Sequence, residues 1–412
     1  MQDILETCRT AKSLTVELAN LPTERKDAML QCVADALRAH SQEILAANRA
    51  DMREAASKPR QFLDRLELTD ARIEGMAQGI EQVIALKDPV GEILEEFDRP
   101  NGLHIVKRRV PLGLLGIIYE ARPNVTADCI ALALKSGNCV VLRGSRDALN
   151  SNLAIVRSVK SELTKAGFQS EYIQLIEDTS REGAERMMKL NGVIDVLLPR
   201  GGAGLIRSVV QNSSIPVIET GTGNCHIYVE KSADLEMAVR IAVNAKTQRP
   251  SVCNAAESLL IDEAVLGKAL PRLAEALRKH GVTIRGCEKC CEVIGDLEPA
   301  SEEDFAAEYL GYTISARAVS GVREAADLVN RYGTHHSDTI VTEDKSAAEL
   351  FLALVDSACV YHNASTRFTD GGEFGFGCEL GISTQKLHAR GPMGLKELTS
   401  YKYCIYGSGQ IR

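Results

Sequence analysis

The sequence contains no tryptophan, and aromatic residues make up only 4% of its 412 residues. Leucine, isoleucine, valine and alanine must therefore fill most of the core, and the length allows two or more domains. Basic residues are also in the minority, with 48 Lys and Arg against 56 Asp and Glu, a net charge of -8. This balance argues against broad nucleic-acid binding, which requires a basic face. It leaves room for a local cationic pocket that binds an anionic substrate.

Long apolar runs are missing as well. The longest, around Leu112 to Tyr119, is too short to cross a bilayer. The N-terminal segment carries acidic residues early and lacks the apolar region of a secretory signal, so we expect a cytoplasmic protein with no membrane association. The 12 cysteines are scattered along the chain. In a reducing compartment most of them are expected to be small buried hydrophobes.

Several ligand-binding motifs are absent. No Gly-x-Gly-x-x-Gly follows the first expected strand of the parallel series, and no Walker A lysine motif is present, so ATP hydrolysis is not expected. Cys287, Cys290 and Cys291 form one cluster, but they lack a fourth ligand and a second paired spacing, which favours a surface loop over a zinc site. His335 and His336 are adjacent and point in different directions. We therefore expect no metal.

The first ninety residues show the hydrophobic spacing of helices, with Leu30, Val33 and Leu37 on one face. Two alternating runs, 92–97 and 103–110, then flank an Asn-Gly pair, the strongest short-range signal for a β-hairpin. Such a hairpin either pairs subunits or is a simple surface ribbon.

From residue 114 onward, apolar strands alternate with amphipathic helices, which is typical of βαβ units around a parallel sheet buried on both faces. A second series of the same kind begins after Tyr228, and the tail 401–406 alternates like an edge strand. The expected strands are 114–119, 139–142, 173–176, 193–198, 216–218, 258–261, 313–319, 338–341 and 358–361. The expected helices are 125–135, 149–166, 181–190, 203–211, 235–246, 263–280, 322–332 and 347–356.

Cys253 is a candidate nucleophile. It lies between a proline-containing loop and the start of a helix or strand. A thiol at a helix N-terminus near a cation has a lowered pKa and more of the reactive thiolate, and Arg249 is a candidate for that cation. On local context alone a buried structural cysteine is the more common interpretation, because the chain has many other cysteines.

Polar residues follow several expected strands at their C-terminal ends, where α/β proteins bind ligands. Asn124 could donate its amide to an oxyanion or act as a helix N-cap, and the cap is the commoner role. The loop containing Arg143 and Ser145 suits a phosphate group, or else forms a capping turn.

Further along, Glu219 follows another expected strand and could be a base, a cofactor clamp or a capping residue. Gly201, Gly202 and Gly204 open an expected helix, whose first N–H groups could meet a phosphate.

Five stretches together resemble the aldehyde dehydrogenase superfamily, and most closely its branch that reduces glutamyl phosphate. They are Val110–Asn124, Ser136–Ser145, Val217–His226, Val252–Glu257 and the run from Asp370 to Gly394. The resemblance covers nearly the whole chain. It implies an α/β, aldehyde-dehydrogenase-like fold with two Rossmann-like α/β domains and a small β-hairpin oligomerisation element. We expect the cofactor-binding domain at 1–97 and 114–226, the catalytic domain at 227–395, and the oligomerisation hairpin and tail at 98–113 and 396–412.

The resemblance also implies roles for individual residues. Cys253 falls at the nucleophile, Asn124 at the oxyanion-holding amide, and Glu219, 34 residues before the cysteine, at the active-site glutamate. The implied cofactor contacts are Glu308 for the nicotinamide ribose, Arg143 and Ser145 for the adenosine ribose or its phosphate, and Gly201 and Gly202 for the pyrophosphate. The implied substrate-binding cations are Arg249, Arg367, Lys386, His388 and Arg390.

Two departures from the superfamily pattern matter. Arg143-Gly-Ser replaces a usual Lys-Pro segment, which fits a phosphate-bearing ribose and hence NADP, without excluding NAD. Ser-Val replaces the usual Gly-Gln before Cys253, so Glu219 could keep its place without acting as a hydrolytic base.

The resemblance implies an NADPH-dependent reduction of L-glutamyl 5-phosphate to L-glutamate 5-semialdehyde and phosphate through a Cys253 thioester, in proline biosynthesis. It also implies a homo-oligomer and allows handover of the substrate from a glutamate kinase. Three alternatives stay open: a related enzyme that oxidises a semialdehyde to a free acid with water, a cysteine acyltransferase or hydrolase without a nicotinamide, and a non-catalytic scaffold. The joint presence of Cys253, Asn124 and Glu219 argues against the scaffold.

Overall fold

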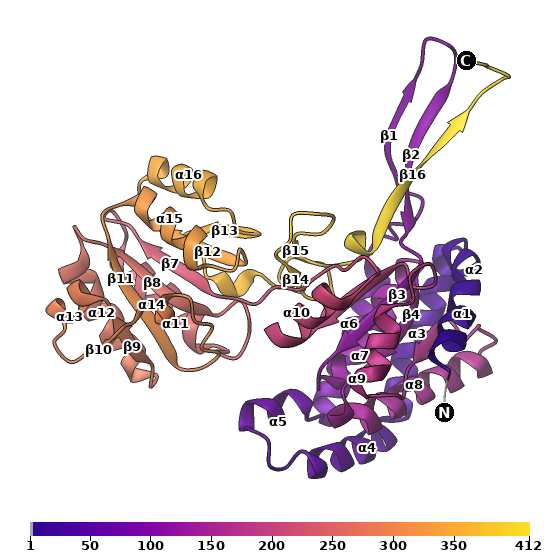
Figure 1. Ribbon diagram of the computed structural model, residues 1–412, viewed down its shortest axis with the longest axis horizontal. Helices are drawn as coiled ribbons and strands as arrows, with labels where there is room; N and C mark the ends of the chain where they lie inside the picture. Colours follow the sequence, from indigo (N-terminus) through magenta and orange to yellow (C-terminus); the bar gives the residue numbers. More distant parts are fainter. Residues whose placement is uncertain (1–2) are drawn as a thin grey trace. The chain divides into compact units, whose positions relative to one another are not determined.

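The computed structural model describes residues 3–412, apart from the side chain at position 61, and divides them into two compact units (Figure 1). The first unit comprises the chain up to Thr220 together with Gly375–Gly381 and Met393–Arg412. The second comprises Gly221–Phe374 and Ile382–Pro392. The chain therefore leaves each unit and returns to it.

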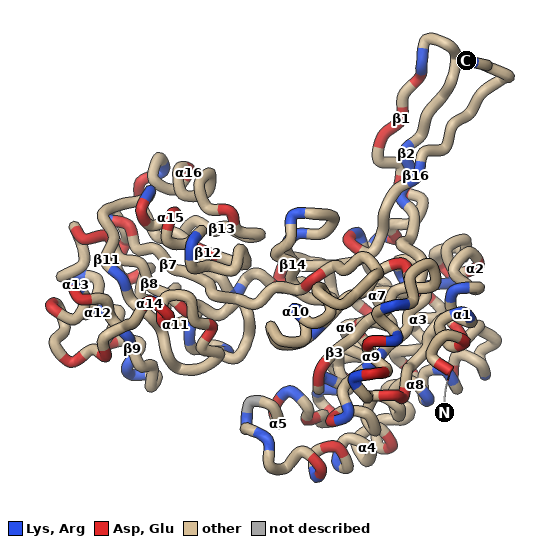
Figure 2. The backbone as a smooth tube through the Cα atoms, viewed as in Figure 1, with Lys and Arg blue, Asp and Glu red and all other residues tan. Residues whose placement is uncertain are grey.

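Six helices precede the first sheet, as the hydrophobic spacing predicted. They are α1 (Ile4–Ser13), α2 (Thr15–Ala19), α3 (Thr23–Ala39), α4 (Ser41–Glu54), α5 (Arg60–Leu66) and α6 (Asp70–Ala85). Leu30, Val33 and Leu37 of α3 are fully buried, and α3 packs against α6 and the later helices of this unit. Basic and acidic residues are interspersed along the outer helices, as α4 shows (Figure 2).

The first unit contains a four-stranded parallel sheet in the order β5-β4-β3-β6. Its strands are β3 (Leu114–Tyr119), β4 (Cys139–Arg143), β5 (Ile173–Leu175) and β6 (Val196–Arg200). The connecting helices are α7 (Pro123–Lys135), α8 (Leu149–Lys165), α9 (Arg181–Met188) and α10 (Ala203–Asn212), with the 3₁₀ turn η1 (Arg146–Ala148) before α8. Every residue of β3 and β4 is buried, as expected for a parallel sheet covered on both faces.

One expected strand of this unit is wrong. Residues 216–218 form only a single β-bridge, between Val217 and Leu197. Leu197 exchanges two backbone hydrogen bonds with this segment, one to the Pro216 carbonyl and one from Ile218. Pro216 has no N–H group, so it cannot donate to the ladder and the pairing does not extend.

The predicted hairpin and edge strand are confirmed as an antiparallel sheet in the order β1-β2-β16. The strands are β1 (Ile93–Asp98), β2 (His104–Pro111) and β16 (Thr399–Tyr406), drawn in purple and yellow in Figure 1. Gly102 has φ +86° in the turn, a left-handed conformation that glycine adopts at low cost. A 3₁₀ turn, η3 (Lys396–Leu398), precedes β16, and Asn138 Nδ2 donates to the Leu398 carbonyl at 2.9 Å.

The second unit contains a seven-stranded parallel sheet in the order β10-β9-β11-β8-β7-β12-β13. Its strands are β7 (Cys225–Val229), β8 (Ala256–Asp262), β9 (Thr283–Gly286), β10 (Glu298–Pro299), β11 (Thr313–Val319), β12 (Ser337–Val341) and β13 (Cys359–His362). The helices are α11 (Leu235–Thr247), α12 (Leu266–Lys279), α13 (Glu288–Val293), α14 (Glu302–Phe305), α15 (Val322–Tyr332) and α16 (Lys345–Leu354). A 3₁₀ turn, η2 (Thr366–Phe368), follows β13, and β14 (Ile382–Ser383) pairs with β15 (Gly391–Pro392).

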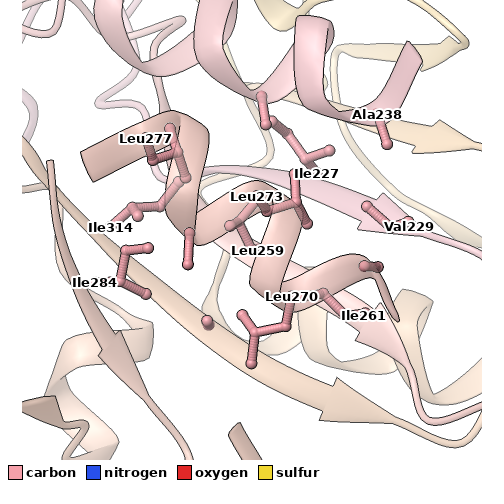
Figure 3. Packing of buried hydrophobic residues seen from close by; sticks show 14 of the residues in the cluster. Ile227, Val229, Ala238, Leu259, Ile261, Leu270, Leu273, Leu277, Ile284 and Ile314 are labelled. Atoms are coloured by element: carbon pink, nitrogen blue, oxygen red, sulfur yellow. The ribbon is translucent and has the colours of Figure 1, made fainter. Parts of the chain in front are cut away.

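Neighbouring residues of a strand point to opposite faces of a sheet. In this sheet the residues on both faces are buried, in two different clusters. Ile227 and Leu259 face α11 and α12 in one cluster, which Figure 3 shows packed against Leu270 and Leu273. The next residues along these strands, Tyr228 and Leu260, belong to a second cluster with α15 and α16. Strands β7, β9 and β10 and helices α13 and α14 were not predicted from the sequence.

Within residues 3–412, no helix combines the length and apolarity needed to span a bilayer.

Candidate active site

Cys253 lies in the turn between α11 and β8 and is half-buried. The Ala255 N–H closes this turn on the Val252 carbonyl at 3.1 Å. The turn leads directly into a strand, so of the two starts that the sequence left open, the structure shows the strand.

A second segment fixes the backbone of this turn. Cys225 Sγ donates to the Cys253 carbonyl at 3.1 Å. Gly223 is buried, and a Cβ atom at this position would lie 1.5 Å from the Cys253 carbonyl oxygen. The two backbones therefore pass so closely that only glycine fits at position 223.

The residue after the thiol is held from the other side. Asn254 is 3% exposed, and its Nδ2 donates to the Thr369 carbonyl at 2.8 Å. Its side-chain oxygen accepts a hydrogen bond from Arg367 Nη1, and Arg367 Nε donates to Gln248 Oε1 at 3.0 Å. These bonds connect the Cys253 turn to the segment around η2 and limit its movement.

Two of the predicted substrate-binding cations lie near Cys253. Burial lowers the pKa of the Arg367 guanidinium, and the negative charge of Asp370 opposes this shift. The nearby charge of Arg249 lowers the pKa of Arg367 further, while Cys253 raises it. Arg367 therefore interacts electrostatically with both Arg249 and Cys253, and the structure gathers positive charge beside the thiol.

The other three predicted cations lie in the loop between β14 and β15. Lys386 Nζ and Arg390 Nη2 lie 2.6 Å and 2.8 Å from the Asp356 carboxylate. Hydrogen bonds from these two cations lower the pKa of Asp356 to about 2. His388 is exposed and has φ +68°. The structure thus pairs Lys386 and Arg390 with a carboxylate of their own unit.

Glu308 reaches the same region as Cys253. Its Oε1 accepts a hydrogen bond from the Gly223 N–H at 2.7 Å, and Gly223 touches the Cys253 backbone. The segment that carries Glu308 is tied down two residues later, because the Leu310 N–H donates to Glu257 Oε1 at 3.1 Å. Glu257 is itself buried in an ion pair with Lys246.

A buried polar group beneath Cys253 was not predicted. Cys225 and His336 are fully buried, with Cys225 Sγ 3.8 Å from His336 Nδ1. Burial raises the pKa of the Cys225 thiol well above its usual value and lowers the pKa of His336 to about 4. Both side chains are therefore neutral near pH 7. Cys225 lies within one of the family-like stretches, but nothing in its local sequence distinguished it from the other cysteines.

In the first unit, Asn124 is the second residue of α7, after Pro123. The N-cap of α7 is Arg122, which makes no side-chain capping bond, so Asn124 does not cap the helix. Its exposed amide instead donates to Asp128 Oδ2 at 3.3 Å. Loss of hydration raises the pKa of Asp128 to about 6, opposed by a hydrogen bond from Cys378 and by the charge of Arg200. The capping interpretation is thereby removed.

Arg143 and Ser145 lie at the C-terminal end of β4, where the first sheet presents its loops. Arg143 is 7% exposed and donates through Nη2 to the Ser180 carbonyl at 2.6 Å. Within residues 3–412, Arg143 Nε, Ser145 Oγ and Asn152 Nδ2 are buried without a hydrogen-bond partner. Buried donors of this kind are costly unless a ligand or water satisfies them, and three donors of this type suit a phosphate group.

Gly202 is the N-cap residue of α10, as the glycine pattern suggested. Its N–H donates to Glu120 Oε2 at 3.0 Å. A Cβ atom at Gly201 would lie 2.6 Å from Glu120 Cδ. A carboxylate therefore already occupies this helix N-terminus, and a pyrophosphate there would compete with Glu120.

Glu219 is half-buried in the segment that follows the Val217 bridge. It lies at the end of the first unit, just before Thr220.

Comparison with known proteins assigns the chain to a protein family. The family model described as "Aldehyde dehydrogenase family" matches residues 1–286. The chain therefore belongs to the aldehyde dehydrogenase family, and the predicted resemblance and fold class are confirmed. It is an oxidoreductase of this family, which uses a nicotinamide cofactor and acts on a small molecule.

Within that family, several relatives that are similar over the whole chain share one name. The gamma-glutamyl phosphate reductase of Clostridium beijerinckii is 54% identical over the full length of both chains. The enzyme of the same name from Caldanaerobacter subterraneus is 53% identical over 98% of each chain. The crystal structure of gamma-glutamyl phosphate reductase from Thermotoga maritima matches the whole chain with a TM-score of 0.96 at 47% identity. An acetylating aldehyde dehydrogenase from Geobacillus thermoglucosidasius, 19% identical with a TM-score of 0.72, shares the fold.

Proposed function

We propose that the chain reduces L-glutamyl 5-phosphate to L-glutamate 5-semialdehyde and phosphate, in proline biosynthesis. Full-length relatives at 53–54% identity that carry the name of this activity support the assignment. The observation that carries it is the environment of Cys253. This thiol sits in a turn held by Gly223, Cys225 and Asn254, with Arg249 and Arg367 supplying positive charge. A fixed nucleophile beside cations suits an activated acyl group that bears negative charge.

The Cys253 thiolate attacks the carbonyl carbon of the acyl phosphate, the bond to phosphate breaks, and a thioester on Cys253 remains. The developing oxyanion accepts a hydrogen bond from the Asn124 amide, the role we assign to this exposed side chain. Arg249 and Arg367 stabilise the anionic groups of the substrate, and their charge favours the thiolate. The two cations paired with Asp356, Lys386 and Arg390, together with His388, have a secondary part in substrate binding.

Glu219 is assigned to the active site without a role as a hydrolytic base. Water must be kept away from the thioester, because hydrolysis would waste the activated substrate. Ser-Val replaces the superfamily's usual Gly-Gln before Cys253, which supports this assignment.

We assign the cofactor as NADP. Arg143, Ser145 and Asn152 present unsatisfied buried donors at the end of β4, which fit the phosphate on the adenosine ribose. Glu308 would hold the nicotinamide ribose, and Gly201 and Gly202 would lie near the pyrophosphate once Glu120 moves from Gly202. When bound, the dinucleotide supplies the hydride that reduces the acyl group. We assign this binding to 1–97 and 114–226, and the thiol chemistry to 227–395.

The test is an assay in the reverse direction, with glutamate 5-semialdehyde, NADP or NAD, and with or without inorganic phosphate. We expect cofactor reduction that requires phosphate and is faster with NADP. Cys253→Ala should abolish it, with Cys291→Ala as a matched control that keeps full activity. Turnover without phosphate would instead support the enzyme that oxidises the aldehyde to a free acid, and retained turnover in Cys253→Ala would reject the nucleophile.

We also propose a homo-oligomer in which a second copy covers the sheet of β1, β2 and β16, the hairpin 98–113 and the tail 396–412. Apolar side chains of this sheet are exposed, and its outer strands are open edges, both features of interaction surfaces. The exposed residues are Ile93, Leu94, Phe97, Tyr401, Tyr403, Ile405 and Tyr406.

A cytoplasmic location completes the proposal. No disulfide links cysteines within residues 3–412, which suits a reducing compartment. Handover from a glutamate kinase would shorten the time that a hydrolysable acyl phosphate spends in water.

A further inference from the structure

Three cysteines lie together at a place that the proposed reaction does not use. Cys287 directly follows β9, and Cys290 and Cys291 lie in the short helix α13. Cys290 is fully buried, whereas Cys287 and Cys291 are half-buried. The strands of this sheet are parallel, so the C-terminal end of β9 lies at the opposite edge from the turn that carries Cys253 before β8.

The three thiols are not equivalent. Cys287 Sγ and Cys290 Sγ lie 3.6 Å apart, within hydrogen-bond distance of one another, and the Ala318 N–H donates to Cys287 Sγ at 3.4 Å. Cys291 is turned elsewhere and donates to the Gly286 carbonyl at 3.4 Å. Cys287 thus accepts a hydrogen bond from a backbone N–H, which favours its thiolate, and Cys290 is its immediate neighbour.

The electrostatics agree with this geometry. The hydrogen bond between the two thiols, helped by backbone N–H groups, lowers the pKa of Cys287 to about 5 despite burial. The same hydrogen bond, together with burial, raises the pKa of Cys290. At neutral pH one member of the pair is therefore a thiolate and the other a thiol, which is the combination that thiol–disulfide exchange requires.

A metal site would be another use of clustered cysteines. Among the residues that the structure describes, no group of three or more His, Cys, Asp or Glu side chains is arranged to hold a metal ion. The spacing Cys287-x-x-Cys290 is shared by redox-active dithiols. A redox function of the Cys287–Cys290 pair is therefore favoured over metal binding.

We propose that Cys287 and Cys290 form a reversible dithiol–disulfide site that reacts with small-molecule disulfides. The Cys287 thiolate attacks one sulfur of RSSR, the S–S bond breaks, and RS⁻ leaves while a mixed disulfide forms on Cys287. The departing RS⁻ takes the proton of Cys290. The Cys290 sulfur then attacks the Cys287 sulfur and releases the second RS⁻. The two protein thiols are oxidised to one disulfide, and RSSR is reduced to RSH and RS⁻.

Peptide mapping tests this proposal. The full chain is incubated with oxidised glutathione, its remaining thiols are alkylated, and it is then digested with trypsin without reductant. Trypsin cleaves after Arg285 and Lys289, so the proposed bridge joins peptides 286–289 and 290–317. We expect this joined species, and its separation on reduction. Cys291→Ser should keep it, and Cys290→Ser should lose it and accumulate glutathione on Cys287. Separate peptides in the wild type, or a joined species that Cys291→Ser abolishes, would overturn the proposal.

A second measurement concerns the reactivity of Cys287. At pH 6 iodoacetamide should label Cys287 in the reduced chain, because a thiol with a pKa of about 5 is mostly ionised there. Cys290→Ala removes the neighbouring S–H group, so labelling at pH 6 should slow by about tenfold or more, as expected from a pKa rise of about two units or more. Unchanged labelling would contradict the thiolate. Both experiments are read by peptide mass and not by turnover, and both should give the same result in a Cys253→Ser background.

Discussion

At the scale of single residues, the chemistry depends on which neighbours satisfy each polar group. Arg249 and Arg367 are near Cys253, whereas Lys386 and Arg390 are paired with Asp356. A cation that is paired with a carboxylate is partly neutralised and attracts an anionic substrate less strongly. We therefore expect Arg249 and Arg367 to contribute more to substrate binding than Lys386 and Arg390. Asn124 illustrates the same principle, since it makes no cap and its amide donates to the Asp128 carboxylate.

Asn124→Ala should lower turnover by roughly a hundred- to a thousandfold, the usual effect of removing one oxyanion donor. Steady-state kinetics in the reverse direction measure this, with thermal unfolding to show that the fold is intact. Asn150→Ala is a matched control, because Asn150 contacts Asp51 far along the chain from the proposed chemistry. A loss below tenfold at Asn124 would argue against an oxyanion role.

At the scale of elements, the second sheet differs from the first in where it carries its candidate residues. Arg143 is the last residue of β4 and Asn124 follows β3, so both lie at the C-terminal ends of strands, the usual ligand-binding edge. In the second unit, Cys253 precedes β8 and Cys225 begins β7, so the candidate thiol lies at the N-terminal edge. The close approach of Gly223 to Cys253 holds this arrangement in place.

Gly223→Ala should therefore disturb catalysis strongly. The added methyl group would meet the Cys253 backbone, and displacement of a nucleophile by about 1 Å can cost on the order of a hundredfold in rate. Turnover and the rate of Cys253 alkylation both report the change. Gly267→Ala in α12 is the control, since its added Cβ meets open space and alanine favours a helix. Equal activity in the two variants would contradict the positioning role of this contact.

Much of this architecture was predictable from sequence, because local signals were strong. The run 114–119 is apolar throughout and matches β3 in full. The Asn101-Gly102 pair predicted the hairpin of β1 and β2. Strand β7 was missed because His226 interrupts its apolar pattern. This histidine is buried, and its Nδ1 lies 3.0 Å from Asp338 Oδ1 on β12, a partner 112 residues away. Long-range pairing of this kind, like that of Asp356 with the β14–β15 loop, leaves no local trace in the sequence.

At the scale of the whole molecule, the sheet of β1, β2 and β16 governs assembly in our proposal. Its exposed tyrosines and isoleucines cost solubility in a monomer, so burial against a second copy would be favourable. Lys107 already lies over the Tyr401 ring at 4.1 Å, and Tyr401 and Tyr403 stack edge to face.

Replacing Tyr403 and Ile405 together by serine should shift the chain to a smaller species, because two of the four large exposed apolar side chains of β16 are lost. Light scattering after size exclusion measures the mass across a range of concentrations. A matched pair of changes at exposed apolar positions elsewhere, Val16→Ser and Val210→Ser, should leave the mass unaltered. An unchanged mass in the β16 variant would contradict the interface.

The division of the chain has a consequence for how the molecule is made. The first unit begins at the N-terminus, yet it is completed by β16 and by the Leu398 carbonyl that Asn138 binds. During synthesis on the ribosome, the second unit is almost wholly translated before these last residues emerge. The first unit must therefore wait with one sheet edge unfilled, and a premature stop near residue 395 would damage the part of the protein that was made earliest.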